Sequence, residues 1–225
     1  MSNPEIHVIL LAAGDGKRTE NAIPKQFLRI SGLPILFYTF QAFSYLREVR
    51  FHLVLNDNHV ELWKELCKEF DFNIQHSIVS GGPTRFHSVK SGLRNIPDNS
   101  IVLIHDGVRP FPSDTTINNV IEVTSRKGNA IPVISTSDSV REIKGIFNKV
   151  IDRKTVKLVQ TPQGFNSSFI KDAYNLPYNE TFTDDSQVLE ATGIKINTVE
   201  GNTENIKITN PLDLIIAEAI VNKSG

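Results

Sequence analysis

The chain has 225 residues, with 24 lysine and arginine residues against 25 aspartate and glutamate residues and a formal net charge of −1. This length suits one domain of ordinary size, and 40% hydrophobic with 22% charged residues argues against a disordered chain. A near-neutral chain lacks the basic face that wholesale nucleic-acid binding needs, so we expect no nucleic-acid partner.

The cysteine count and the N-terminal sequence indicate the cellular compartment. The single cysteine, Cys67, rules out an intrachain disulfide and any multi-cysteine zinc site. No basic residue precedes the first apolar run, and that run ends at Gly14, so it is neither a signal peptide nor a transmembrane helix. We therefore expect a cytoplasmic protein with no membrane partner.

The predicted elements alternate between strands and helices, which indicates an α/β sandwich with right-handed crossovers. Continuous apolar runs are typical of strands covered on both faces in a parallel sheet. In chain order, the pattern predicts strands at 6–11 and 51–55, a helix from 58 to about 70, a weak strand at 74–79, a helix at 85–93, strands at 101–104 and 130–134, weak strands at 195–199 and 205–209, and a helix from 211.

Two of these helices have a recognisable start. Asn58 with Glu61 three residues later resembles a capping box. Asn210 followed by Pro211 supplies a good cap and a first-position proline, and this is the clearest helix start in the chain.

Residues 140–153 break the alternation and predict a β-hairpin. Strands at 140–143 and 146–153 are joined by a tight turn at Lys144-Gly145. An inserted hairpin must cover its apolar side chains. The sequence leaves two possibilities open, namely an edge hairpin lying on its own domain and an arm that pairs with another subunit.

The first predicted strand runs into the loop Leu-Ala-Ala-Gly-Asp-Gly-Lys-Arg, residues 11–18. Ligands of open α/β sheets bind beyond the carboxyl ends of strands, so this loop lies where chemistry is expected. Its glycines allow amide N–H groups to approach phosphate oxygens, and Lys17, Arg18 and Lys25 add positive charge. The segment predicts a polyanion site; the alternative is a solvated glycine turn with ordinary surface cations.

Several other motifs do not fit. The spacing of a P-loop is absent, and a dinucleotide fingerprint needs a third small residue where Thr19 stands and an acidic residue near Ile35. The six histidines lack metal-ligand spacing, and no Gly-x-Ser-x-Gly elbow exists. A zinc site and a serine hydrolase are therefore disfavoured.

The loop signature, followed by Pro24-Lys25-Gln26, resembles the cytidylyltransferases that activate polyol phosphates. Within this family it is most similar to the enzymes of the non-mevalonate isoprenoid pathway, whose acceptor is 2-C-methyl-D-erythritol 4-phosphate. The resemblance covers nearly the full length and continues in order through residues 81–82, 85, 88–89, 105–110, 152–153, 161–163, 183–185, 200–201 and 205–209.

This resemblance implies a fold and an assembly. The fold is a Rossmann-like nucleotidyltransferase sandwich with a mainly parallel sheet and a protruding β-hairpin dimerisation arm. Residues 1–225 form a single domain, in which residues 136–158 are the arm insertion. The resemblance also implies a homodimer in which Arg153 enters the partner's active site.

The resemblance further implies residue roles. The implied CTP contacts are Ala12, Ala13, Gly14, Gly16, Gly82 and Ser88, and the cations that bind the triphosphate are Arg18, Lys25 and Lys207. The implied acceptor contacts are Asp106, Arg109, Thr161 and Arg153, and Asp106 also holds Mg²⁺ or another divalent cation. The implied catalytic residues are Arg18, Lys25, Lys207 and Asp106.

The residue types suit these roles, although each has an ordinary structural interpretation. Magnesium prefers carboxylate and phosphate oxygens, and an arginine fork fits a phosphate. Asp106 could equally cap a turn, Arg109 could form a surface ion pair, and Lys207 could be an exposed strand lysine. Pro83, which has no N–H to donate, and His87, where an aspartate is common, depart from the family pattern and weaken the preference for cytosine over uracil.

The expected reaction is transfer of a cytidylyl group from CTP to 2-C-methyl-D-erythritol 4-phosphate, with release of pyrophosphate. Two alternatives stay open. A ribitol-5-phosphate cytidylyltransferase resembles the same motifs and uses another short polyol phosphate. A non-catalytic nucleotide-binding module would keep the loop, but the joint presence of Lys25, Asp106, Arg109 and Lys207 argues against it.

Overall fold

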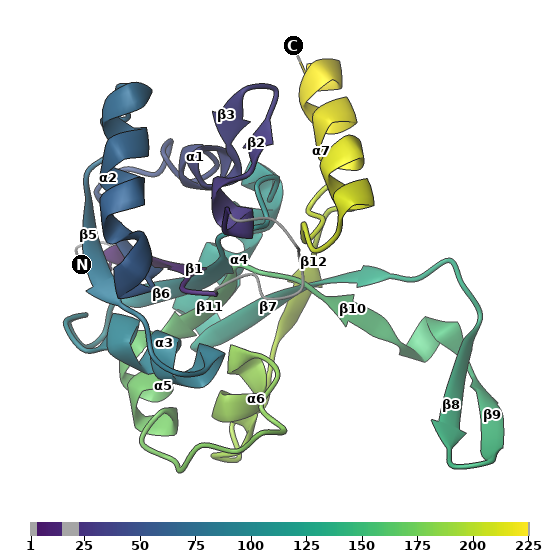
Figure 1. Cartoon of the computed structure of the whole chain (residues 1–225). Coiled ribbons are helices and arrows are strands. Elements are labelled where there is room, and N and C mark those ends of the chain that lie inside the picture. Colours follow the sequence, from purple (N-terminus) through teal and green to yellow (C-terminus); the bar gives the residue numbers. More distant parts are fainter. Residues whose placement is uncertain (1–3, 15–22, 225) are drawn as a thin grey trace.

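The computed structural model describes residues 4–14 and 23–224, which form a sheet with helices on both faces and a hairpin that projects away (Figure 1). The strands are β1 (Ile6–Ala12), β2 (Arg29–Ile30), β3 (Leu33–Pro34), β4 (Val49–Leu55), β5 (His76–Ser80), β6 (Ile101–Asp106), β7 (Asn129–Ser135), β8 (Val140–Lys144), β9 (Phe147–Ile151), β10 (Lys157–Val159), β11 (Gln163–Asn166) and β12 (Thr198–Glu200). The helices are α1 (Ile35–Gln41), α2 (Val60–Glu69), α3 (Arg85–Leu93), α4 (Asp114–Lys127), α5 (Ser167–Ala173), α6 (Asp185–Glu190) and α7 (Pro211–Ser224), with 3₁₀ turns η1 (Lys25–Phe27), η2 (Asp57–His59) and η3 (Arg153–Thr155).

The main sheet has the strand order β10-β7-β11-β6-β1-β4-β5, and β12 also pairs with β7. Strands β6, β1, β4 and β5 are parallel neighbours, whereas β11 runs antiparallel between β6 and β7. The predicted α/β sandwich with a mainly parallel sheet is therefore confirmed, and the carboxyl ends of its parallel strands meet at one edge.

The central strand β1 explains why its sequence is apolar without alternation. Val8 and Leu10 pack in a cluster with side chains of α1, α2 and α4, whereas Ile9 packs with those of α3, α5 and α6. All three residues have no exposed surface. Because both faces of the strand are covered, every position is selected for apolar character.

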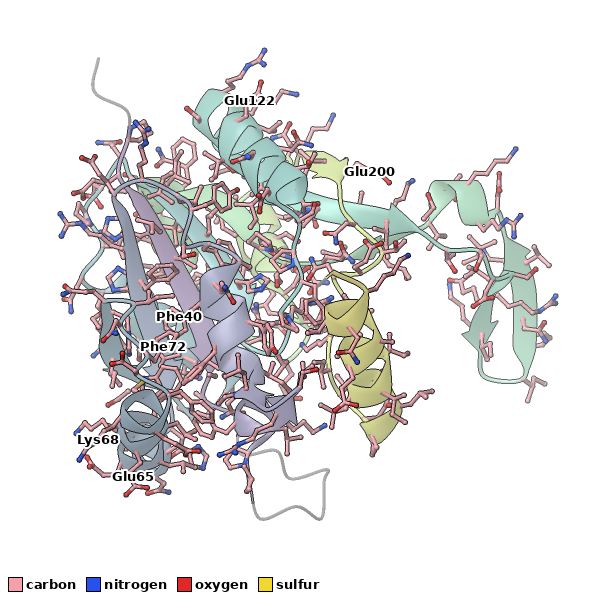
Figure 2. The ribbon with its side chains drawn as sticks, turned by 90° about the horizontal axis from the view of Figure 1, so that it is seen from above. Phe40, Glu65, Lys68, Phe72, Glu122 and Glu200 are labelled. Carbon is pink, nitrogen blue, oxygen red and sulfur yellow. The ribbon has the colours of Figure 1, made fainter. Side chains whose placement is uncertain are left out.

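An aromatic layer fills the space between the sheet and helices α1 and α2. Phe40 and Phe72 lie close together in Figure 2, with ring centroids 5.2 Å apart. Trp63 stacks on Phe40 at 5.8 Å, and its indole N–H donates to Nε2 of His76 at 2.8 Å. The layer joins β5 to α2 through both apolar contact and a hydrogen bond.

The hairpin of β8 and β9, which lies between β7 and β10 in the chain, projects beyond the sheet (Figure 1). Gly145 lies in its turn with a φ of 59°, a conformation that favours glycine. Ile143 and Phe147 are each 74% exposed, so the apolar side chains of the hairpin are not covered by their own chain. The last two residues of the predicted arm, 157 and 158, return to the sheet and pair with β7 in β10.

Three weak strand predictions need correction. The strand expected at 74–79 begins at His76, because Ile74 packs against the aromatic layer and its carbonyl accepts from His76 Nδ1. The strand expected at 195–199 is β12, Thr198–Glu200. Residues 205–209 form no strand, because Ile208 packs beneath α7 and the segment forms no ladder with a neighbouring strand.

The two helix starts have different outcomes. Asn210 Oδ1 accepts from the N–H of Asp213 at 3.1 Å, which confirms the predicted start of α7. The capping box at Asn58 is wrong, since Asn56 accepts from Asn58 N at 3.0 Å and α2 begins only after η2. Within the described ranges, none of the helices combines the length and the apolar character needed to cross a bilayer.

Candidate active site

A cavity of about 750 Å³ opens at the edge of the sheet where the parallel strands end. Its walls come from segments that follow β1, β4, β5 and β6, which is the expected ligand site of an open α/β sheet. The lining consists of residues 11–14, 82–85 and 207–209 together with Lys25, Gln26, Asn56, Ser88, Asp106 and Val108.

One wall is the loop after β1, which is held by η1. Gln26 is buried, and its amide Nε2 donates to the carbonyl oxygen of Ala12 at 2.7 Å. This bond sets Lys25 beside the loop, and the Lys25 ammonium donates to the carbonyl oxygen of Thr209. Ala12, Ala13 and Gly14 all line the cavity. The predicted site residues Gly16 and Arg18 lie outside the described residues.

A second wall is the turn between β5 and α3. The N–H of Gly82 donates to Ser88 Oγ at 3.1 Å, so the Ser88 hydroxyl holds the peptide of the turn. A Cβ on Gly82 would lie 2.3 Å from Cβ of His87, which leaves room for glycine alone. His87 Nδ1 lies 2.8 Å from Oγ1 of Thr84, the residue that caps α3, and Pro83 lines the cavity.

Asp106, the last residue of β6, is surrounded by cations. Lys207 Nζ lies 2.8 Å from its Oδ2, Arg109 Nε lies 3.5 Å from the same oxygen, and Arg85 Nε lies 3.6 Å from Oδ1. The side chain is only 11% exposed, so Asp106 is a largely buried residue and not a solvent-facing strand end. Burial alone raises the pKa of this carboxyl, but the charges of Arg85, Lys207 and Arg109 outweigh it and hold the pKa well below its ordinary value of 3.8.

A buried hydrogen-bonded chain fixes the backbone of Asp106. Its N–H donates to Thr161 Oγ1 at 3.1 Å. His105 Nε2 lies 2.8 Å from the carbonyl oxygen of Arg109, which can only accept, so Nδ1 is free to accept from the Thr161 hydroxyl at 2.9 Å. Burial lowers the pKa of His105 to about 4, so the imidazole is neutral near pH 7.

Arg109 lies behind the cavity wall. Its Nη1 donates to the carbonyl oxygen of Asn205 at 2.8 Å, and the side chain is 13% exposed. Asn205 is fully buried and its amide Nδ2 donates to the carbonyl oxygen of Thr161 at 2.8 Å. Through these bonds Arg109 and Thr161 connect β6 to the segment that carries Lys207.

Arg153 lies in η3 at the base of the hairpin, where it donates to the carbonyl oxygen of Ser137. It is exposed and lines no part of the cavity of its own chain. The structure thus brings together Ala12, Ala13, Gly14, Lys25, Gly82, Ser88, Asp106 and Lys207, with Arg109 and Thr161 directly behind Asp106.

Sequence reasoning assigned no role to Arg85, although it lines the cavity. Its guanidinium donates to both carboxylate oxygens of Asp185, at 2.8 and 2.6 Å. Asp185 accepts a third bond, from the hydroxyl of Tyr174 at 2.6 Å, and is fully buried. The signal in the sequence that could have indicated a role for Arg85 is the adjacent pair of acids, Asp184 and Asp185, because a buried acid requires a cationic partner.

Comparison with known proteins identifies the family. The family model described as 2-C-methyl-D-erythritol 4-phosphate cytidylyltransferase matches residues 6–223. Relatives with that name from Phocaeicola vulgatus and Bacteroides thetaiotaomicron are 44% identical over 216 residues and 40% identical over 215; the matches cover 96% and 95% of this chain and 99% and 98% of the relatives. The crystal structure of 4-diphosphocytidyl-2C-methyl-D-erythritol synthase from Anaerococcus prevotii superposes with a TM-score of 0.83 at 28% identity, covering 97% of this chain and 96% of that one. The chain therefore belongs to the 2-C-methyl-D-erythritol 4-phosphate cytidylyltransferase family and is a nucleotidyltransferase.

Proposed function

We propose that the cavity binds CTP and that the chain transfers its cytidylyl group to 2-C-methyl-D-erythritol 4-phosphate, giving CDP-methylerythritol and pyrophosphate. One observation carries this proposal: Lys25, Asp106 and Lys207, which come from three distant parts of the chain, line one cavity together with the loop after β1. Two lysines and a carboxylate beside a glycine loop suit a triphosphate and its counter-ion.

The base of the nucleotide is assigned to the turn formed by Gly82 and Ser88. Because the Ser88 hydroxyl already holds the Gly82 peptide, the turn offers backbone groups in a fixed arrangement to the edge of a pyrimidine. Pro83 cannot donate from its nitrogen, so backbone discrimination between cytosine and uracil falls to the neighbouring peptides.

The triphosphate is assigned to Lys25 and Lys207, with Arg18 as a further cation. The acceptor's phosphate oxygen attacks the α-phosphorus in line and pyrophosphate leaves. A phosphate monoester is already anionic near neutrality, so the site needs no strong general base. Catalysis comes from holding two mutually repelling anions together and from neutralising the charge that accumulates in the transition state.

A divalent cation fits this site with one protein ligand. The Asp106 carboxylate reaches the cavity, and Mg²⁺ commonly binds one or two carboxylates together with substrate phosphates. Among the described residues there is no group of three or more metal-binding side chains, so Asp106 would hold the ion together with oxygens of the triphosphate. When bound, the ion neutralises phosphate charge and polarises the α-phosphoryl group.

The acceptor is assigned to Asp106, Arg109 and Thr161 of one subunit and to Arg153 of a second. The exposed apolar side chains of the β8–β9 hairpin support a homodimer in which the hairpin is the dimerisation arm. The absence of Arg153 from its own chain's cavity lining supports a role in the partner's site. A cytoplasmic location is consistent with the single Cys67, since the fold needs no oxidising compartment.

Pyrophosphate release tests the proposal, with CTP and either 2-C-methyl-D-erythritol 4-phosphate or ribitol 5-phosphate offered in parallel. We expect turnover with the first acceptor, loss of that turnover after exhaustive chelation, and its return with added Mg²⁺. Turnover with ribitol 5-phosphate alone would replace the proposed acceptor. No CTP turnover with either acceptor would instead indicate a nucleotide-binding module.

A further inference from the structure

The guanidinium of Arg85 lies between a carboxylate in the cavity and one buried behind it. Its two terminal nitrogens donate to the two oxygens of Asp185, at 2.8 and 2.6 Å. The remaining nitrogen, Nε, lies 3.6 Å from Oδ1 of Asp106. Asp185 itself has no exposed surface and lines no part of the cavity, and Arg85 is the residue that connects it to the site.

Asp185 is held firmly enough to orient its partner. It is the first residue of α6, which Asp184 caps by accepting from the N–H of Gln187 at 3.0 Å. The Tyr174 hydroxyl donates to Asp185 Oδ1 at 2.6 Å. Burial, followed by the nearby charge of Asp185, raises the pKa of Tyr174 well above its usual value, so the phenol keeps the proton that it donates.

Asp185 and Asp106 compete for the two terminal nitrogens of Arg85, which form its fork. A guanidinium binds a carboxylate most strongly when both terminal nitrogens donate side by side. Arg85 lies beside Asp106, with Nε 3.6 Å from Oδ1, but its two terminal nitrogens are occupied by Asp185. Asp106 therefore receives the Nε edge of Arg85 at Oδ1, while its Oδ2 faces Lys207 and Arg109.

We propose that Asp185 is a positioning residue for the reaction, because it engages the fork of Arg85 and so prevents Arg85 from closing on Asp106. The inference rests on the proposed function, in which Asp106 helps to hold a divalent cation on the nucleotide. The ion pair between Arg85 and Asp185 thus does more than stabilise the packing of α3 and α6. It keeps the oxygens of Asp106 available to ligands that enter the cavity.

Asp185→Asn keeps the shape of the side chain but leaves a single acceptor for the fork. One terminal nitrogen of Arg85 then becomes free to bind Asp106. We expect kcat to fall by about 10- to 100-fold, the usual effect of losing a group that orients a metal ligand. The Mg²⁺ concentration that gives half-maximal rate should rise several-fold.

The experiment is a cycle of four proteins: wild type, Asp185→Asn, Arg85→Gln and the double variant. Each is assayed for kcat, for Mg²⁺ half-saturation and, independently of turnover, for binding of Mn²⁺ with CTP by electron paramagnetic resonance. In the Arg85→Gln background, Asp185→Asn should cause no further loss in either metal measurement. Asp98→Asn is the matched control, since it breaks the exposed ion pair with Lys171 on α5 and should change nothing.

The outcomes separate a positioning role from a structural one. The inference is overturned if Asp185→Asn yields less folded protein but the folded fraction keeps the Mg²⁺ dependence of the wild type. If Asp185→Asn does not fold, the comparison of Arg85→Gln with the double variant still decides, because a tenfold loss between these two contradicts action through Arg85. Failure of the wild type to bind Mn²⁺ with CTP would instead reject the proposed function itself.

Discussion

Asp106 is the residue on which the two halves of the site converge. Its N–H donates to Thr161, while its carboxylate faces the cations Arg85, Arg109 and Lys207. Because Arg109 is largely buried and Asp106 is its nearby counter-charge, the carboxylate also supports the fold. Function and stability are therefore coupled at this position.

Asp106→Asn should lower turnover by at least about 10²-fold, the scale expected for a lost charge partner in the transition state. It should also lower the melting temperature, since Arg109 loses its counter-charge. Pyrophosphate release and thermal unfolding measure the two effects. An unchanged melting temperature would show that Arg109 does not depend on Asp106.

Lys25→Ala and Lys207→Ala should each reduce turnover by about 10²- to 10³-fold, because each removes a positioned cation from the developing phosphate charge. The melting temperature should change little, since Lys207 is 43% exposed. Lys64→Ala on α2, which breaks an exposed pair with Glu61, is the control for loss of a surface lysine. Near-native rates in either variant would remove that lysine from the site.

The sequence identified the cavity-lining residues better than the residues behind them. Lys25 follows a glycine loop whose suitability for a polyanion is visible in the local sequence, whereas the family resemblance implied the roles of Asp106 and Lys207. The bonds of Arg109 to Asn205, and of Thr161 to Asp106, connect segments far apart in the chain. Such partners depend on tertiary packing, so no local pattern indicates them.

At the scale of elements, apolar runs and caps predicted what lies in the centre of the molecule. Strand β1 is apolar on both faces, and Asn210 caps α7, so these elements follow from local sequence. The segment at 205–209 has the same composition as a short strand but packs beneath α7. Composition cannot distinguish apolar side chains that pack under a helix from those of a paired strand.

A chain of polar side chains crosses the neighbouring strands β1, β4 and β5. The carboxylate of Glu5 can only accept, so His7 donates to it at 3.3 Å, His52 donates to His7 at 2.9 Å, and the Ser77 hydroxyl donates to His52 at 2.9 Å. Burial, followed by the charges of His7 and Arg50, lowers the pKa of His52 to about 4. Both histidines are neutral in the folded chain near pH 7.

Stability should therefore fall in mild acid. In the unfolded chain His52 takes a proton near its ordinary pKa of 6.5, whereas in the folded chain it resists protonation until about pH 4. The contribution is complete above about pH 6.5 and is lost as pH falls toward 4. Denaturant midpoints of wild type and His52→Gln, compared at pH 7.5 and 5, measure it; equal losses in both proteins would exclude His52 as the source.

At the scale of the whole molecule, the projecting hairpin is the feature that would divide each active site between two chains in the proposed homodimer. Ile143 and Phe147 present apolar surface to solvent in one chain, and Arg153 at the hairpin base lines no part of its own cavity. In an isolated chain this apolar surface would stay in contact with water, which is unfavourable. A closed two-fold pairing would cover it and bring Arg153 to the second cavity.

Mixed dimers test this division directly. Arg153→Ala and Lys207→Ala chains should each be nearly inactive alone. In a mixed dimer, the site of the Arg153→Ala chain keeps its own Lys207 and receives Arg153 from its partner, so it is intact. Random pairing makes about half of the dimers mixed and about one site in four intact, so co-expression should restore roughly a quarter of normal activity. Activity at the parental level, with mixed dimers verified by mass spectrometry, would reject the shared site.

Trp63 is the only tryptophan of the chain, which gives the aromatic layer a spectroscopic signal of its own. The indole is 1% exposed, and its N–H donates to His76, whose other nitrogen contacts the carbonyl oxygen of Ile74. An indole in so apolar a setting fluoresces at shorter wavelength than one in water. The red shift of its emission on denaturation therefore reports when α1 and α2 separate from the sheet, without any added dye.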